Sequence, residues 1–265
     1  MFELKLSSSA CSARLALLRE PCAGDELLSD GAGPTAVTEW LGGLLLGGSG
    51  AALGKDDVWR LSLSDRDRIV ALLHAVCFGD RVESRVTCSA CRDTFEVDFS
   101  LASLIESLES EERSGDVEGP DEHGKYRLAG GGSFRLPTTD DERAVAGLPI
   151  EEAMRELVRR CAATDQATSD YEKLDRAMAA VAPVVDLDFT ATCAVCGVEQ
   201  TVHFDLVSFF VAALARERPL LMREIHKLAL AYHWSRAEIL ALPRSVRRAH
   251  VALIEAEHAA RRGAA

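Results

Sequence analysis

Two short stretches decide the fold: "CSACRDTFEVDFSL" spans Cys88–Leu101 and "CAVCGVEQTVHFDL" spans Cys193–Leu206. Each opens with a C-x-x-C pair, continues with alternating polar and apolar residues, and ends in Phe-x-Leu. All matching positions are separated by the same offset of 105 residues. Strand-like alternation on both sides of each pair predicts two β-hairpins with cysteines at their tips, and the constant offset indicates an internal duplication.

The chemistry of the cysteines suggests why the unit occurs twice. A C-x-x-C turn aims two sulfurs at one point, whereas a structural zinc site needs four ligands in a tetrahedron. The sequence therefore predicts one Cys₄ site for Zn²⁺, a zinc ribbon, built from Cys88, Cys91, Cys193 and Cys196. The stretch between the pairs is far longer than the roughly 15–20 residues usual in such sites, which indicates a large insertion.

Two other interpretations of the cysteines remain open. They could be core residues without metal, or a redox pair of the thioredoxin type. In thioredoxin-like sites the pair precedes a helix, whose N-terminus lowers a thiol pKa, whereas here strand-like alternation follows each pair. The zinc site is therefore the leading prediction.

The chain of 265 residues is 48% hydrophobic and 27% charged, with a net charge of −12. This composition is typical of a globular protein, and the acidic balance disfavours nucleic acid as a partner. The N-terminus lacks a secretory pattern, and the apolar stretch at 41–53 is short and glycine-rich. We expect a cytoplasmic protein without a membrane partner, whose eight cysteines serve metal binding or the core.

The order of patterns predicts an α+β fold that is mostly helical, with the zinc ribbon as a small central β element. Residues 1–60 are expected to be a loop-rich segment, because glycine and short polar runs interrupt them. Residues 61–210 are expected to hold the ribbon core, with a helical insertion at about 104–185. Residues 211–265 are expected to form a helical tail, interrupted at Pro219 and restarted by a capping box at Ser235 and Glu238.

The tail also holds the candidate partner-binding residues. From Arg216 onward it has ten Lys/Arg and five Asp/Glu, on a chain that is otherwise acidic. A basic helix face suits either solvent or an acidic partner. The residues predicted to contact a partner are His226, His233, Trp234, Arg244, Arg247 and Arg248.

Sequence signatures of catalysis are missing. The chain contains no G-x-G-x-x-G motif, Walker lysine loop or G-x-S-x-G elbow, and its histidines are not spaced as H-E-x-x-H. We therefore expect no enzymatic activity, no catalytic residues and no small-molecule substrate.

Several motifs together resemble a known family. They are the segment 64–101 with the first cysteine pair, "FRLPTTDD" at 134–141, the second cysteine pair, and "REIHKLALAYHWSRAEILALPRSVRR" at 223–248. This combination, over roughly residues 60 to 255, resembles baseplate proteins of contractile phage tails. It is similar to the baseplate hub assembly proteins of T-even phages and to relatives encoded with extracellular contractile injection systems.

The resemblance implies a non-enzymatic role in building or forming a baseplate, with other baseplate or tail proteins as partners. It leaves open whether the protein stays in the phage-tail-like particle or leaves as an assembly factor. Two alternatives come from the cysteines alone. A zinc-ribbon nucleic-acid-binding protein would use the tail arginines, although no stacking aromatic residues accompany them. A thiol oxidoreductase is the third hypothesis.

Overall fold

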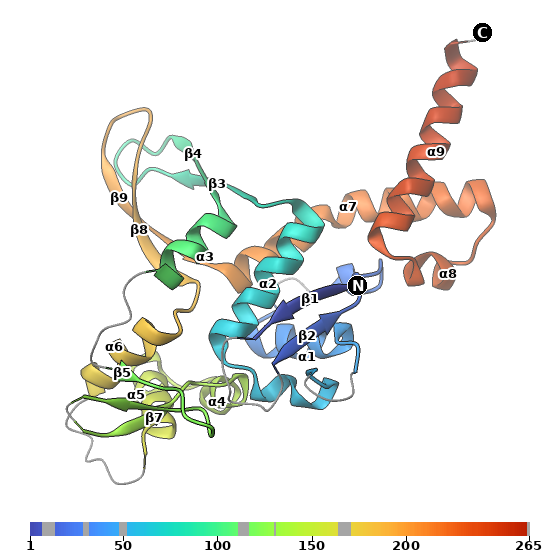
Figure 1. Ribbon diagram of the computed structural model, residues 1–265. Coiled ribbons are helices and arrows are strands. Elements are labelled where there is room, and N and C mark those ends of the chain that lie inside the picture. Colours follow the sequence, from blue (N-terminus) through green and yellow to red (C-terminus); the bar gives the residue numbers. More distant parts are fainter. Residues whose placement is uncertain are drawn as a thin grey trace.

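The computed structural model describes residues 1–6, 14–28, 32–47, 52–110, 117–129, 131–163 and 171–263. It is 55% helical and contains small antiparallel sheets, which confirms the mixed, mostly helical fold. Figure 1 shows a central body, a pair of hairpins that projects from one side and a helical arm that projects from the other.

The projecting pair consists of the two hairpins expected from the repeat. The first joins β3 (Arg81–Thr87) to β4 (Thr94–Ser100), and the second joins β8 (Asp186–Thr192) to β9 (Glu199–Asp205). All four strands keep the 105-residue offset, and the pairing register is the same in both hairpins. The duplication is thus structural as well as sequential.

The N-terminal segment is more ordered than its glycine content suggests. It forms a β1–β2 hairpin and one α-helix, with two short 3₁₀ helices, and their buried side chains join the main core. Leu18 and Leu41 are fully buried there. The expectation of a loop-rich segment at 1–60 is corrected accordingly. The elements are β1 (Phe2–Lys5), β2 (Leu15–Leu18), η1 (Asp25–Leu27), α1 (Pro34–Leu44) and η2 (Lys55–Arg60).

Helix α2 (Leu63–Phe78) runs through the body and connects its parts. Ser62 caps its N-terminus, because the Ser62 hydroxyl accepts a hydrogen bond from the Asp65 amide. Gly79 ends it with a positive φ of 92°. The main core around α2 also takes in the bases of both hairpins, so the hairpins are anchored on the body.

The insertion between the hairpins is not purely helical, which corrects the sequence prediction. It contains a three-stranded antiparallel sheet, on which two helices pack to form a separate small core. Tyr126 and Phe134 stack there with ring centroids 5.4 Å apart. Its elements are α3 (Leu101–Ser110), β5 (Val117–Glu118), β6 (Lys125–Leu128), β7 (Ser133–Arg135), α4 (Thr139–Val145), α5 (Ile150–Cys161) and α6 (Tyr171–Val181).

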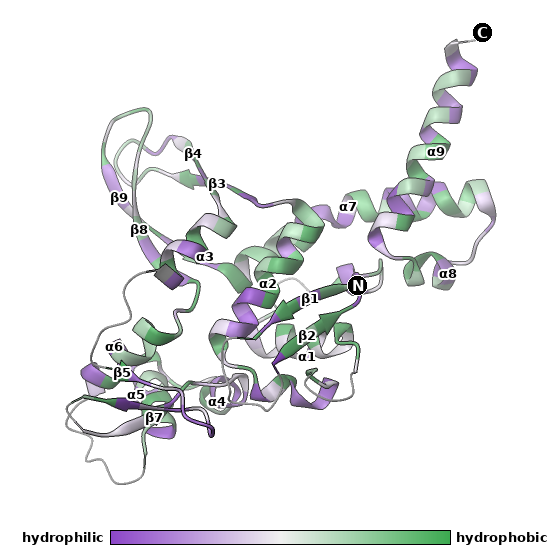
Figure 2. Cartoon of the chain, in the orientation of Figure 1, coloured by the Kyte–Doolittle hydropathy of each residue, from purple (hydrophilic) through white to green (hydrophobic). Residues whose placement is uncertain are grey.

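The arm comprises the second half of α7 (Leu206–Tyr232), then α8 (Arg236–Ala241) and α9 (Arg244–Gly263). Helix α7 continues through Pro219, so the expected interruption is wrong, and the helix crosses the expected boundary between 210 and 211. Pro219 lies on the exposed side, where solvent can satisfy the freed carbonyl, and buried Leu214 and Leu221 hold both flanks. Figure 2 shows hydrophilic and hydrophobic residues alternating along α9, as expected for a helix that packs on one side.

Candidate metal centre

Each hairpin tip is shaped by one left-handed residue at the same point of the repeat. Arg92 has φ 66° and Gly197 has φ 75°. In both tips the amide of this residue donates to the carbonyl of the first cysteine, Cys88 or Cys193. The left-handed residue turns the chain back so that both thiols of a pair face the same side.

The two tips bring all four cysteine sulfurs together. Cys88 Sγ lies 3.6 Å from Cys196 Sγ, and Cys91 Sγ lies 3.8 Å from Cys193 Sγ. All four sulfurs lie within 4.8 Å of one another. A tetrahedron with metal–sulfur bonds of about 2.3 Å has edges of roughly 3.8 Å. A disulfide would need about 2.05 Å, so the four thiols match a metal site rather than a pair of disulfides.

The cluster is buried on one side and open on the other. Cys88 and Cys193, the first cysteine of each pair, are buried, Cys91 is half-buried and Cys196 is exposed. Phe95 packs beside Cys88 and Cys193 in a small apolar cluster. This environment shields the sulfurs from competing water while leaving an entry path for an ion.

Electrostatics at the tips shift the thiol pKa values in opposite directions. Backbone amides of Cys91 and Ala90 donate to the Cys88 sulfur and lower the pKa of Cys88 to about 6. The Asp93 amide favours the Cys91 thiolate, but burial and the neighbouring sulfurs outweigh it and raise the pKa of Cys91 to about 12. Four crowded sulfurs therefore cannot all ionise by themselves. A divalent cation would supply the positive charge that lets them do so.

The remaining described cysteines behave differently. Burial raises the pKa of Cys77 to about 11 and that of Cys161 to about 12. Cys77 is buried on α2, and Cys161 lies in the small core of the insertion. A neutral, buried thiol is neither a good nucleophile nor a ready metal ligand. Cys11 lies outside the described residues. Among the described residues, the four tip cysteines form the one group with metal-ligand geometry.

Contacts between the hairpins hold the site from both ends. At the base, Phe99 of one hairpin and Phe204 of the other meet edge to face, with centroids 5.1 Å apart. Near the tips, the Gln200 side chain accepts from the Ser89 amide at 2.8 Å and donates to the Thr87 carbonyl at 3.3 Å. The residue of the first hairpin that corresponds to Gln200 is Phe95, 105 residues earlier. This difference between the two repeats is the only sequence signal for the role of Gln200.

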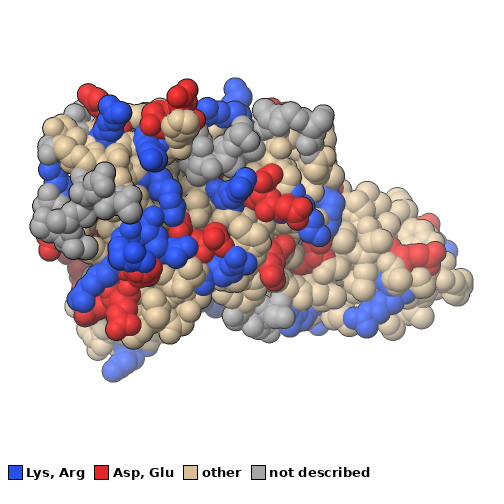
Figure 3. Space-filling model, turned by 90° about the horizontal axis from the view of Figure 1, so that it is seen from below, with Lys and Arg blue, Asp and Glu red and all other residues tan. Residues whose placement is uncertain are grey.

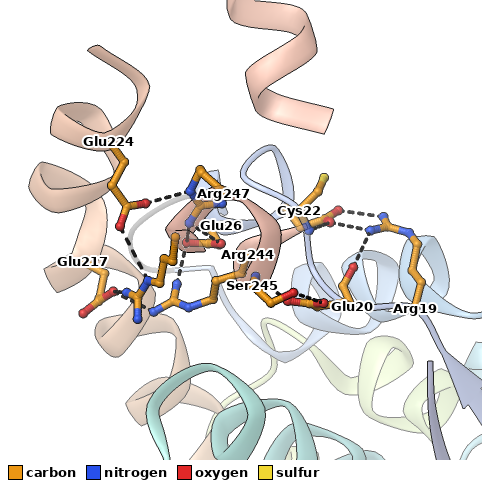
Figure 4. Close-up of polar contacts among 11 residues, drawn as sticks. Arg19, Glu20, Cys22, Glu26, Glu217, Glu224, Arg244, Ser245 and Arg247 are labelled. Atoms are coloured by element: carbon orange, nitrogen blue, oxygen red, sulfur yellow. Dashed lines mark hydrogen bonds and ion pairs between the residues drawn. The ribbon is translucent and has the colours of Figure 1, made fainter. Parts of the chain in front are cut away.

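Two of the three candidate tail arginines lie inside the molecule. Arg244 and Arg247 have exposures of 4% and 0%. Arg247 donates to both oxygens of Glu26 and to Glu224, while Arg244 donates to Glu26 and Glu217. Figure 4 shows these side chains converging from the N-terminal segment, α7 and α9. They fasten the arm to the body and are not a surface for a partner, which corrects their predicted role.

The other candidate tail residues are more accessible. His226 and His233 are exposed, and His233 ends α7 in the left-handed region with φ 55°. Arg248 is half-buried and pairs with Glu217 and Glu224. Trp234 stacks on Tyr232 at 4.7 Å, in the turn between α7 and α8. These residues do not converge on one site. Glu26, which sequence reasoning missed, lies in a short 3₁₀ helix with no periodic pattern to mark it.

The surface carries charged side chains of both signs, although the net charge of the chain is −12. Figure 3 shows basic and acidic side chains interspersed over the face seen from below. Within the described ranges, no helix is both long and apolar enough to cross a membrane.

Comparisons with known proteins found no match to this chain among family models, curated proteins or solved structures.

Proposed function

We propose that the protein is a non-enzymatic structural or assembly component of a contractile-tail baseplate, stapled by a Cys₄ zinc site. The observation that carries the proposal is the cysteine cluster, in which two hairpins 105 residues apart join their sulfurs within 4.8 Å. A zinc ion there would close the chain around the whole insertion. Zinc is the preferred ion because four thiolates in a tetrahedron suit it and it brings no redox chemistry.

The arm gives the second line of support. The motif at 223–248, the most specific part of the resemblance to baseplate proteins, coincides with the end of α7, all of α8 and the start of α9. Its residues form the aromatic turn at Trp234, the capping box of Ser235 with Glu238, and the ion pairs of Arg244 and Arg247. A rigid projecting arm suits an assembly protein, which must present a fixed surface to neighbours.

The metal is tested first. Protein purified without chelator should contain about one zinc ion per chain by mass spectrometry. A chain that is folded without metal, and whose four tip thiols titrate freely, would refute the staple. If the bound ion is iron instead of zinc, the four-cysteine site stands, but the proposed identity of the metal is wrong.

The assembly role needs a separate experiment. Any tube, sheath and spike proteins encoded near this gene would be co-expressed with the chain, and complexes would be identified by native mass spectrometry. We expect a defined complex with at least one of them. If none forms, and the gene has no such neighbours, the baseplate role fails even if zinc is present. A salt-sensitive gel shift with DNA or RNA would favour the nucleic-acid-binding alternative instead.

A further inference from the structure

The two hairpin tips share one backbone but differ in surface chemistry. At the positions where the first tip has Ser89, Ala90 and Asp93, the second has Ala194, Val195 and Val198. Val195 is 62% exposed and Val198 is 39% exposed. Together they give the second tip an apolar end that the first tip lacks. The second tip is therefore the better suited of the two to contact an apolar partner.

The first tip shows what this backbone can bind. The Cys88 amide donates to the Asp93 carbonyl, so the neighbouring Thr87 pair is not hydrogen-bonded and the Thr87 carbonyl points away from β4. Gln200 fills this edge with one amide group: its oxygen accepts from Ser89 and its nitrogen donates to Thr87. An outward carbonyl at one residue and an outward N–H two residues later are what a strand edge offers to a neighbouring strand.

The second tip presents the same edge without a Gln200. The Cys193 amide donates to the Val198 carbonyl, so the Thr192 carbonyl points away from β9 and Ala194 occupies the place of Ser89. The residue at the position of Gln200 is Phe95, which is 5% exposed and has no polar group to offer. Among the described residues, no acceptor lies against the Ala194 amide.

A pocket of about 550 Å³ lies at this edge. Phe95 and Ala194 are among its lining residues, and Arg85 and Glu96 form an exposed ion pair 3.4 Å apart on its β3–β4 side. Thr94 completes the lining. Figure 1 shows the tips of both hairpins well away from the body, where another chain could reach them.

We propose that the outer edge of β8 at Thr192–Ala194 binds an extended, apolar peptide segment of a partner protein. One residue of that segment, through its own N–H and C=O, takes the place that the Gln200 amide takes on the first tip. Its flanking side chains rest on Val195, Val198 and the pocket beside Phe95. A peptide fits better than a single side-chain amide, because a strand supplies both the hydrogen bonds and the apolar contacts. This inference depends on the hairpin geometry and not on the baseplate role.

The test uses the full-length, metal-loaded chain and a phage-displayed library of random peptides of about eight residues, long enough for one strand. Selected peptides would be synthesised and their affinities measured by calorimetry. We expect alternating apolar sequences whose affinity falls about tenfold when the pairing peptide nitrogen is methylated. Loss of affinity on replacing a Gln or Asn of the peptide, with no effect of methylation, would overturn strand pairing in favour of a side-chain amide.

Variants of the chain locate the site. Ala194→Pro removes the amide at a turn position that suits proline, and should weaken binding about tenfold. Ser89→Pro is the matched control: it removes the corresponding amide of the first tip, so it should lower thermal stability but leave peptide affinity unchanged. Val198→Asp, which copies the first tip and leaves the backbone intact, should also weaken binding. Metal content and melting temperature are measured for each variant.

Two results would overturn the proposal that this edge binds a peptide. If Ala194→Pro and Val198→Asp retain metal and bind the peptides as tightly as wild type, the site is elsewhere. If the library yields no peptide that binds above background, the second tip is not a peptide-binding edge. Either result leaves the zinc and assembly experiments, and hence the proposed function, unaffected.

Discussion

Arg247 Nη2 contacts both carboxylate oxygens of Glu26, at 2.8 and 2.9 Å, although 221 residues separate the two side chains in sequence. Both side chains are buried, with exposures of 3% and 0%. The pair joins the short 3₁₀ helix η1 to the first turns of α9 (Figure 4). The orientation of the arm thus depends on the N-terminal segment.

Removing this carboxylate should destabilise the protein. In Glu26→Ala, Arg244 and Arg247 lose a shared partner inside the molecule, and breaking a buried ion pair costs about 3 kcal/mol or more. Urea unfolding, followed by circular dichroism, measures the change. Glu151→Ala is the control, because its pair with Arg155 is exposed at 3.5 Å and contributes less than about 1 kcal/mol. Equal stability of the two variants would show that the buried pair does not fasten the arm.

The zinc staple predicts that the two halves of the repeat are equivalent. Cys88→Ser and Cys193→Ser should each abolish metal binding and lower the melting temperature by a similar amount, since bound metal is part of the folding free energy. Cys22→Ser is the control, because this half-buried thiol lies outside the cluster and should leave metal content unchanged. A ligand variant that melts like wild type would mean that the metal is not structural.

The hairpins and the cysteine site were predictable because local signals specify them. Alternation marks the strands, and C-x-x-C spacing fixes the donor set. The 105-residue offset then pairs the halves, and it holds in all four strands, from Arg81 to Asp205. The sheet of the insertion was missed because β5 has two residues and β7 has three, too few for a period to show.

The roles of the tail arginines depended on tertiary structure. A basic helix has the same sequence signature whether its guanidinium groups meet solvent or buried glutamates. Arg244 is buried by Glu26, which lies 218 residues away in a segment with no periodic pattern. Pro219 shows the same limit: its helix-breaking tendency is local, whereas the burial of Leu214 and Leu221 that overrides it is not.

Acid should release one stabilising contact in the insertion. Burial alone would raise the pKa of Asp141, but hydrogen bonds from Arg135, Thr138 and Arg160 outweigh it and hold the pKa well below its ordinary value. The contribution of a carboxylate with a lowered pKa is fully present above its unfolded pKa of 3.8 and is lost as the pH falls toward the folded value. The stability lost below about pH 4 should therefore come in part from this group.

Asp141→Asn isolates that contribution. The difference in unfolding free energy between wild type and variant should be largest near neutral pH. It should shrink below about pH 4, where the unfolded wild-type carboxyl becomes protonated while the folded one stays ionised. Urea titrations between pH 3 and 7, monitored by fluorescence, would measure it. Asp140→Asn, at an exposed pair with Arg143, should show a much smaller difference. A gap that stays constant across this range would contradict the lowered pKa.

The arm should loosen without its central aromatic residue. Trp234 stacks on Tyr232 and meets His250 edge to face at 5.2 Å, so its ring connects the end of α7 to α9. Trp234→Ala should cost about 2 kcal/mol, less than a fully buried Trp because the ring is half-buried. Hydrogen exchange should quicken in α8 and α9, while metal content and the hairpins remain unchanged. His226→Ala, at an exposed position on α7, should leave exchange as it is. If Trp234→Ala exchanges like wild type but no longer co-purifies with tail proteins, the ring contacts a partner rather than holding the arm.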